Sequence, residues 1–187
     1  MIRWLIVLFG GVLLGGMIHL VTVLAMPRIA TLDAYSRLQP VTAENAVTVL
    51  PATTTDAAPM PYMDPAFAVA ICRYDLGRGP LKLTLPVSQA YTSVSFYTRN
   101  EVPYYAINDR SAGRRVIDLY LMTEAQHAEM PEEEDVTAAD RLIIDSPTPK
   151  GLIVLKALAP EPGLMGQARA ALTAAKCGLD TVPPATR

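Results

Sequence analysis

Six polar residues near the ends of predicted strands are the candidates for ligand chemistry in this sequence. They are Arg73, Asp75, Arg99, Asn108, Asp109 and Arg110. Loops on a rigid β scaffold are common ligand-binding places, and a guanidinium beside carboxylates can hold a polar ligand bidentately. The same residues also suit plain turns and ion pairs, because Asn-Asp favours turns and Arg73 and Asp75 share one strand face. Both interpretations stay open.

No motif in the sequence identifies a reaction. The two histidines, His19 and His127, are far apart, so a multi-histidine metal site is hard to build. The sequence has no HExxH, no Walker-type loop and no Gly-x-Ser-x-Gly elbow, and Gly77-Arg78-Gly79 lacks the third glycine of a dinucleotide loop. The acidic run at 132–135 is more typical of a solvated surface than of a cation site. We expect no cofactor and no metal, and favour a protein that is not an enzyme.

Cys72 and Cys177 are the only cysteines, which excludes a four-cysteine zinc site and a disulfide-dense scaffold. One disulfide is possible, and in the chain-entropy model closing so long a loop would stabilise the fold by about 4–5 kcal/mol. Two separate buried thiols are the alternative, since free cysteine is commonly buried.

The N-terminal segment is the clearest feature of the chain. Residues 4–26 carry no formal charge and, as a helix, would span about 34 Å, enough to cross a hydrocarbon core of about 30 Å. Pro27 and Arg28 end the run. A cleaved signal peptide is the rival interpretation, but its apolar region usually runs only about 7–15 residues. The length therefore favours a retained transmembrane anchor.

The orientation of this anchor is less directly encoded. Arg3 precedes the span and Arg28 and Arg37 follow it, which taken alone would put the C-terminal side in the cytoplasm. Long domains, however, translocate largely regardless of charge. We therefore expect an outward-facing, periplasm-like domain.

One face of the predicted span consists of Gly11, Gly15 and His19. A GxxxG pair lets two helices approach closely, and an imidazole can hydrogen-bond across such a contact. No second ligand or acidic relay partner lies within the span, so helix packing is favoured over metal or proton chemistry.

The rest of the chain is predicted to be mainly β (α+β), an antiparallel β-sandwich or barrel-like domain with a C-terminal helix. Short alternating or β-branched runs separated by turns are typical of such folds. The domain plan is an anchor at 1–26, a tether and loop with a possible first strand at 27–61, a β-rich domain at 62–178 and a flexible tail at 179–187. Strands are predicted at 47–50, 66–74, 81–85, 91–98, 116–122 and 151–158.

Two helical pieces are predicted within this domain, and a short surface helix is expected before it. The first piece is 123–129, capped by Thr123. The second is 162–177, with an apolar stripe and Gly178 in the C′ position. The surface helix is expected at 29–38, ended by Pro40.

Three stretches resemble an uncharacterised bacterial family, the domain of unknown function 1254 family. The most specific runs from Met63 to Leu76, followed by Gly79-Pro80, and the others are 91–97 and 106–111. The resemblance covers roughly residues 1–178 and implies a β-rich fold. Short members are membrane-anchored, whereas longer relatives fuse the module to a second domain. The resemblance thus implies a companion domain encoded separately, and it supplies no catalytic residues.

The sequence as a whole predicts a single-pass protein of a bacterial inner membrane whose C-terminal domain is periplasmic and serves as an accessory or protein-interaction module. The expected partners are the lipid bilayer and another membrane protein or companion domain. Nucleic acid is not expected, because the net charge is −2 with both signs interspersed. The alternative is a membrane-tethered ligand-binding or hydrolytic domain that uses the Arg, Asp and Asn loop residues.

Overall fold

The computed structural model describes residues 1–29, 33–52, 60, 62–113, 115–129 and 142–180. The acidic run at 132–135 and most of the loop that precedes residue 62 lie outside these residues. The chain forms two compact units, Met1–Asp33 and Ala34–Arg187, and each is described by itself.

The first unit is the helix α1 (Ile2–Ile29). Its stretch Ile2–Met26 has a mean hydropathy of 2.2 and contains no buried residue. Cβ atoms added at Gly11 and Gly15 would meet no atom within 4 Å, so this face of the helix is open. A helix of this length and apolarity can cross a bilayer, and a secretory signal sequence can meet the same criterion.

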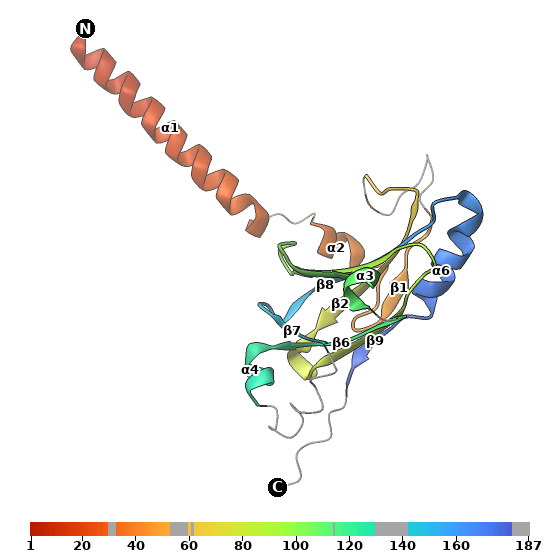
Figure 1. Ribbon diagram of the computed structural model, residues 1–187. Helices are drawn as coiled ribbons and strands as arrows, with labels where there is room; N and C mark the ends of the chain where they lie inside the picture. The colour runs from red at the N-terminus through yellow and green to blue at the C-terminus, as the bar shows by residue number, and fades with distance from the viewer. Residues whose placement is uncertain (30–32, 53–59, 61, 114, 130–141, 181–187) are drawn as a thin grey trace. The chain divides into compact units, whose positions relative to one another are not determined.

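The second unit consists of two β-sheets packed face to face (Figure 1). The five-stranded sheet has the order β1 (Val47–Val49), β2 (Phe67–Asp75), β8 (Lys150–Leu158), β4 (Thr92–Thr98) and β5 (Pro103–Asn108), all antiparallel. The four-stranded sheet has the order β7 (Leu142–Ser146), β6 (Val116–Thr123), β3 (Leu81–Pro86) and β9 (Lys176–Leu179). Its β6–β7 pair is parallel. The predicted mainly β fold with flanking helices is confirmed.

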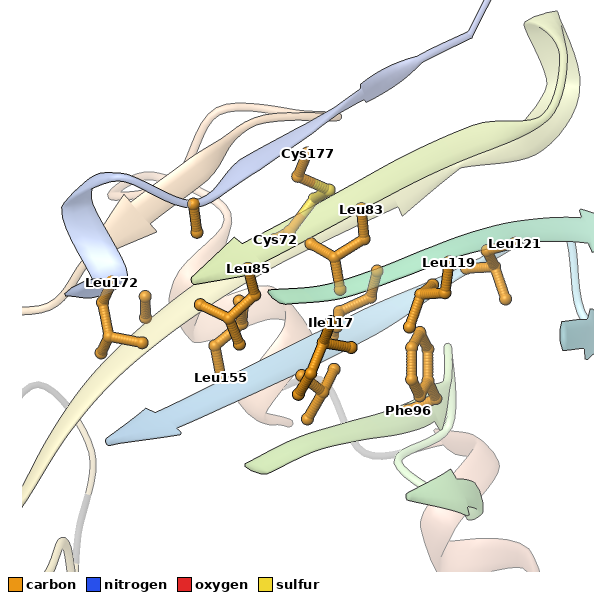
Figure 2. Close-up of a cluster of buried hydrophobic side chains, with 14 of the residues drawn as sticks. Cys72, Leu83, Leu85, Phe96, Ile117, Leu119, Leu121, Leu155, Leu172 and Cys177 are labelled. Carbon is orange, nitrogen blue, oxygen red and sulfur yellow. A yellow bond between two sulfur atoms is a disulfide. The ribbon is translucent and has the colours of Figure 1, made fainter. Parts of the chain in front are cut away.

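The main core lies between the two sheets. Leu81, Leu83 and Leu85 alternate along β3 with half-buried polar residues, so period-two patterning sends every second side chain inward. They meet Phe96 and Leu155 of the other sheet, and Figure 2 shows these side chains converging on one interior. Burial of this apolar surface, at about 25 cal/mol per Å², is the main favourable term in holding the sheets together.

A disulfide links the two sheets. Cys72 on β2 and Cys177 on β9 are joined with Cα atoms 6.5 Å apart, across a sequence separation of 105 residues (Figure 2). Cys72 is fully buried in the core, so the crosslink is shielded from solvent.

A buried polar junction also connects the sheets. The Tyr74 hydroxyl lies 3.0 Å from the Oγ of Ser146 on β7 and 3.2 Å from the hydroxyl of Tyr104 on β5. The Ser146 hydroxyl donates to the carbonyl of Thr148, and burial raises the pKa of Tyr104 well above its ordinary value. The Tyr74 ring lies against Gly151, where an added Cβ would overlap the ring and a backbone carbonyl. Glycine is therefore required by this close approach.

Short helices complete the unit: α2 (Ala34–Leu38), α3 (Asp109–Ala112), α4 (Glu124–Ala128), α6 (Met165–Thr173) and the 3₁₀ turns Leu76–Arg78 and Pro162–Leu164. Thr123 caps α4 as predicted, and the structure adds a capping box in which Thr123 and Gln126 bond reciprocally. Helix α6 packs against β1, β2 and β8 through buried Ala168 and Leu172.

Three strands differ from the sequence prediction. Residues 103–108 and 142–146 form β5 and β7, neither of which was predicted, and the predicted helix 162–177 ends at Thr173. The chain then enters β9, because pairing with β3 and the bridge to Cys72 override the helical pattern of these residues. The compact unit also begins earlier than residue 62, since α2 and β1 belong to it.

We predict that reducing the disulfide lowers the free energy of unfolding by about 4–5 kcal/mol, because the unfolded chain regains the entropy of a long loop. Denaturant unfolding of the full-length protein in detergent, with and without reductant, measures this change. A Cys72→Ala/Cys177→Ala variant is the control, and reductant should leave its midpoint unchanged. Equal stability of the oxidised and reduced wild type would contradict the prediction.

Candidate functional site

Two interior strands of the five-stranded sheet, β2 and β8, carry apolar side chains on both faces over much of their length. Inward, β2 presents Ala70 and Cys72 to the core, and outward it presents Val69 and Ile71. Strand β8 repeats the pattern, with Leu152 and Val154 on the outer face. A strand of this kind needs cover on both sides, so the outer face requires a second layer.

Helix α2 supplies part of that layer. Its Tyr35 and Leu38 are buried with Leu50 against Ile71 and Leu152. Five residues cannot cover the whole face, and the part that the described residues leave uncovered forms a cavity of about 410 Å³. We call it the outer-face pocket, and its floor and walls include Leu38, Met63, Val69, Ile71, Leu152 and Val154. Its volume is in the range of small-molecule sites, about 300–1,000 Å³.

Beside α2, two guanidinium groups contact the same aromatic ring. The Cζ atom of Arg99 lies 4.1 Å from the centroid of the Tyr35 ring, and that of Arg73 lies 5.4 Å from it. Arg73 is 8% exposed and donates to the side-chain and backbone oxygens of Thr42 and to the Tyr35 hydroxyl. These contacts fasten α2 and the following turn to the sheet through cation–π attraction and hydrogen bonds.

Two charged groups at the edge of the outer-face pocket have local partners. The carboxylate of Glu101 accepts hydrogen bonds from the backbone N–H groups of Ala34 and Tyr35, which caps α2. The carboxylate of Asp64 accepts from the N–H of Ala66 at 2.9 Å. Both carboxylates are therefore engaged by backbone donors.

Asp75 forms an ion pair with Lys150 across the β2–β8 ladder, with Nζ and Oδ2 2.7 Å apart. The Lys150 ammonium, with help from the Gly77 N–H, lowers the pKa of Asp75 to about 2. Arg73 therefore contacts Thr42 and Tyr35, whereas Asp75 pairs with Lys150.

Asn108, Asp109 and Arg110 lie away from the arginine pair. Across the sheet, Asn108 pairs with Ser93, and Ser93 pairs with Lys156 on β8. Arg73 pairs with Leu152, which lies four residues from Lys156 along the same strand. The Asn108 side chain caps α3 by accepting from the Ser111 N–H, and Asp109 accepts from the Thr92 N–H at 3.4 Å. Arg110 is exposed on α3. The structure thus brings Arg73 and Arg99 together but not the other four candidates.

His127 on α4 faces Asp145 on β7, with Nδ1 and Oδ1 2.9 Å apart. Both side chains are at least a third exposed, and within the described ranges no group of three or more His, Cys, Asp or Glu residues could hold a metal ion. The pair links α4 to the sheet edge.

The family comparison covers most of this architecture. A family model described as "Protein of unknown function (DUF1254)" matches residues 41–177. The chain belongs to this family. The matched region of this DUF1254 protein includes both sheets and the floor of the outer-face pocket, whereas α1 and α2 precede it. A search among curated proteins found no match.

A solved structure shares the fold. This chain is similar to the VPA0106 protein from Vibrio parahaemolyticus, with a TM-score of 0.61 at 9% identity over 83% of this chain and 35% of that one. It also matches a putative uncharacterized protein from Burkholderia cenocepacia, with a TM-score of 0.47 at 13% identity over 68% of this chain and 34% of that one. The DUF1254 chain thus spans about a third of the length of these solved proteins. At such identities, the first match shows the fold alone.

The pocket residues escaped sequence reasoning because their types suggest a core. Val69, Ile71 and Val154 belong to runs in which neighbouring residues on the opposite face are also apolar. Such a run predicts a strand buried on both faces. No local signal in the sequence marks this outer face as partly covered, because the sequence predicts a helix over 29–38 whereas the structure has α2 over Ala34–Leu38.

We predict that Lys150→Met lowers stability at pH 7 and that the difference from wild type narrows as the pH falls from about 4 toward 2. The folded-state pKa of Asp75 is lowered to about 2 from an ordinary value of about 3.9. The ion pair therefore stabilises the fold above the unfolded-state pKa and loses its effect as Asp75 is protonated.

Thermal unfolding of both proteins between pH 2 and pH 7 measures the difference. Lys176→Met, which removes an exposed lysine on β9, is the matched control and should show no such pH dependence. A constant difference between Lys150→Met and wild type across this range would refute the assignment.

Proposed function

We propose that this protein is a single-pass, membrane-anchored module of the bacterial envelope, with α1 in the inner membrane and the β domain on the periplasmic side. The observation that carries the proposal is the apolar stretch Ile2–Met26, which has a mean hydropathy of 2.2 and no buried residue. So large an apolar surface is unfavourable in water and favourable in lipid.

The Cys72–Cys177 bridge supports the outward orientation. Disulfides form and persist in oxidising compartments such as the periplasm and are rare in the cytoplasm. A bridge between the two sheets suits a domain that works where its thiols would be oxidised.

Within this role we propose that the module is an accessory or interaction protein without enzymatic activity of its own. The polar candidates support this proposal, because Arg73, Asp75 and Asn108 each bind neighbouring protein groups. The open Gly11/Gly15 face supports contact with another membrane helix, and a companion domain on a separate chain is a further candidate partner. A tethered ligand-binding domain is the second candidate, and the outer-face pocket favours it.

We expect the full-length protein to stay in the membrane fraction with its N-terminus intact and its C-terminus outside the cytoplasm. Intact-mass measurement of the extracted protein and a C-terminal alkaline phosphatase fusion test both parts. Leu13→Arg/Leu14→Arg is the control for membrane insertion, because inserting each charged side chain at the centre of a transmembrane span costs about 2.5–3.5 kcal/mol. A mature protein that starts near Met26, or a cytoplasmic C-terminus, would overturn the proposal.

We expect Gly15→Leu to weaken helix pairing in membranes about tenfold, because a large side chain prevents close approach of the helices. Crosslinking in native membranes measures the paired fraction. Gly16→Leu changes a neighbouring glycine that lies about 100° around the helix and should have a smaller effect. A strict monomer whose behaviour is the same in both variants would exclude the Gly11/Gly15 face as an interface.

A further inference from the structure

The outer-face pocket has the lining of a site for a hydrocarbon chain. Its floor consists of the outward side chains of β2 and β8, and Met60 and Met63 form part of its wall. Methionine side chains are flexible and polarisable, so they adapt to an apolar ligand of variable shape. The apolar part of this cavity of about 410 Å³ suits methylene groups, whereas Asp64, Glu101 and Lys156 supply charged groups at its rim.

The apolar surface continues beyond this cavity. A second hollow of about 530 Å³ shares Met63, Phe67 and Val69 with the outer-face pocket and extends toward Pro160 and Met165 beside α6. Two hollows that share three wall residues suit an occupant that is long and narrow. An extended acyl chain has this form, whereas a compact aromatic ligand would fill one hollow.

The charge at the rim indicates the head group of this occupant. Lys156 on β8 pairs with Val69 on β2 and is exposed. Its Nζ atom lies 6.0 Å from the centroid of the Phe67 ring. Among the residues that the structure describes, no carboxylate lies within ion-pair distance of Lys156, whereas Asp64 and Glu101 are engaged by backbone N–H groups. Lys156 is thus the cation that the described part of the rim offers to an anion.

We propose that the outer-face pocket binds a single long hydrocarbon chain that carries an anionic head group, with the chain along the outer face of β2 and β8 and the head group at Lys156. This deepens the proposed function, because anchoring in a bilayer provides a nearby source of such molecules. Only four residues separate Ile29, the end of α1, from Ala34 at the pocket wall, so a bilayer anchor would hold the domain near lipid.

The test uses full-length protein in phosphatidylcholine nanodiscs and a C16 fatty acid that carries a photoreactive diazirine. After illumination and proteolysis, mass spectrometry locates the adducts. We expect labelling on the peptides that contain Val69 and Val154. The same sample is scored for incorporation into nanodiscs, so failure of anchoring and failure of binding are read separately. Adducts confined to α1 or spread over the four-stranded sheet would overturn the proposal.

Variants test the chain and the head group separately. Val69→Trp fills the cavity and should abolish pocket labelling, with the thermal midpoint measured to verify folding. Lys156→Glu should reduce labelling about fivefold through loss of the ion pair and added repulsion. Lys176→Glu, an exposed lysine on β9 that lines neither hollow, is the matched control and should leave labelling unchanged.

The corresponding diazirine C16 alcohol completes the test. In the wild type, we expect the alcohol to label the pocket more weakly than the acid does. The alcohol should label Lys156→Glu to the same extent as it labels the wild type, since it has no charge to pair. Equal labelling of wild type by acid and alcohol would refute the assignment of Lys156 to the head group. Labelling that persists in a folded Val69→Trp variant would refute the pocket itself.

Discussion

The pairing of β2 with β8 is the interaction on which the rest of this domain depends. The two strands are in register over nine residue pairs, from Phe67↔Leu158 to Asp75↔Lys150, and both are apolar on both faces. One face is covered by the four-stranded sheet and sealed by the Cys72–Cys177 bridge. The other is covered in part by α2, and the remainder is the outer-face pocket. The core and the candidate site are thus two sides of one strand pair.

Polar contacts decide how this layered arrangement is held in place. The buried guanidinium of Arg73 reaches the oxygens of Thr42 and the ring of Tyr35, so it fixes α2 over the sheet without a carboxylate partner among the described residues. On the inner side, Tyr74 crosses Gly151 to reach Ser146 in the other sheet. Each contact satisfies a buried polar group that would otherwise be costly. These polar contacts position α2 over the sheet and join the two sheets.

A fold similar to that of this domain also occurs in a longer protein. The VPA0106 protein from Vibrio parahaemolyticus carries a similar fold in about a third of its length. A similar architecture therefore occurs as part of a larger chain.

The sequence by itself determined the apolar N-terminal helix and five of the central strands, because hydropathy and period-two alternation are local properties. It also identified Cys72 and Cys177 as a possible bridge, and only the tertiary structure brought them together. Residues 142–146 and 176–179 became strands through pairing with β6 and β3, and residues 103–108 through pairing with the preceding strand β4. Pairing of this kind is a tertiary contact and was not evident from the local pattern of these residues. The pocket could not be predicted for the same reason. Val69 and Val154 are residue types typical of a core, and their exposure depends on how little of the sheet α2 covers.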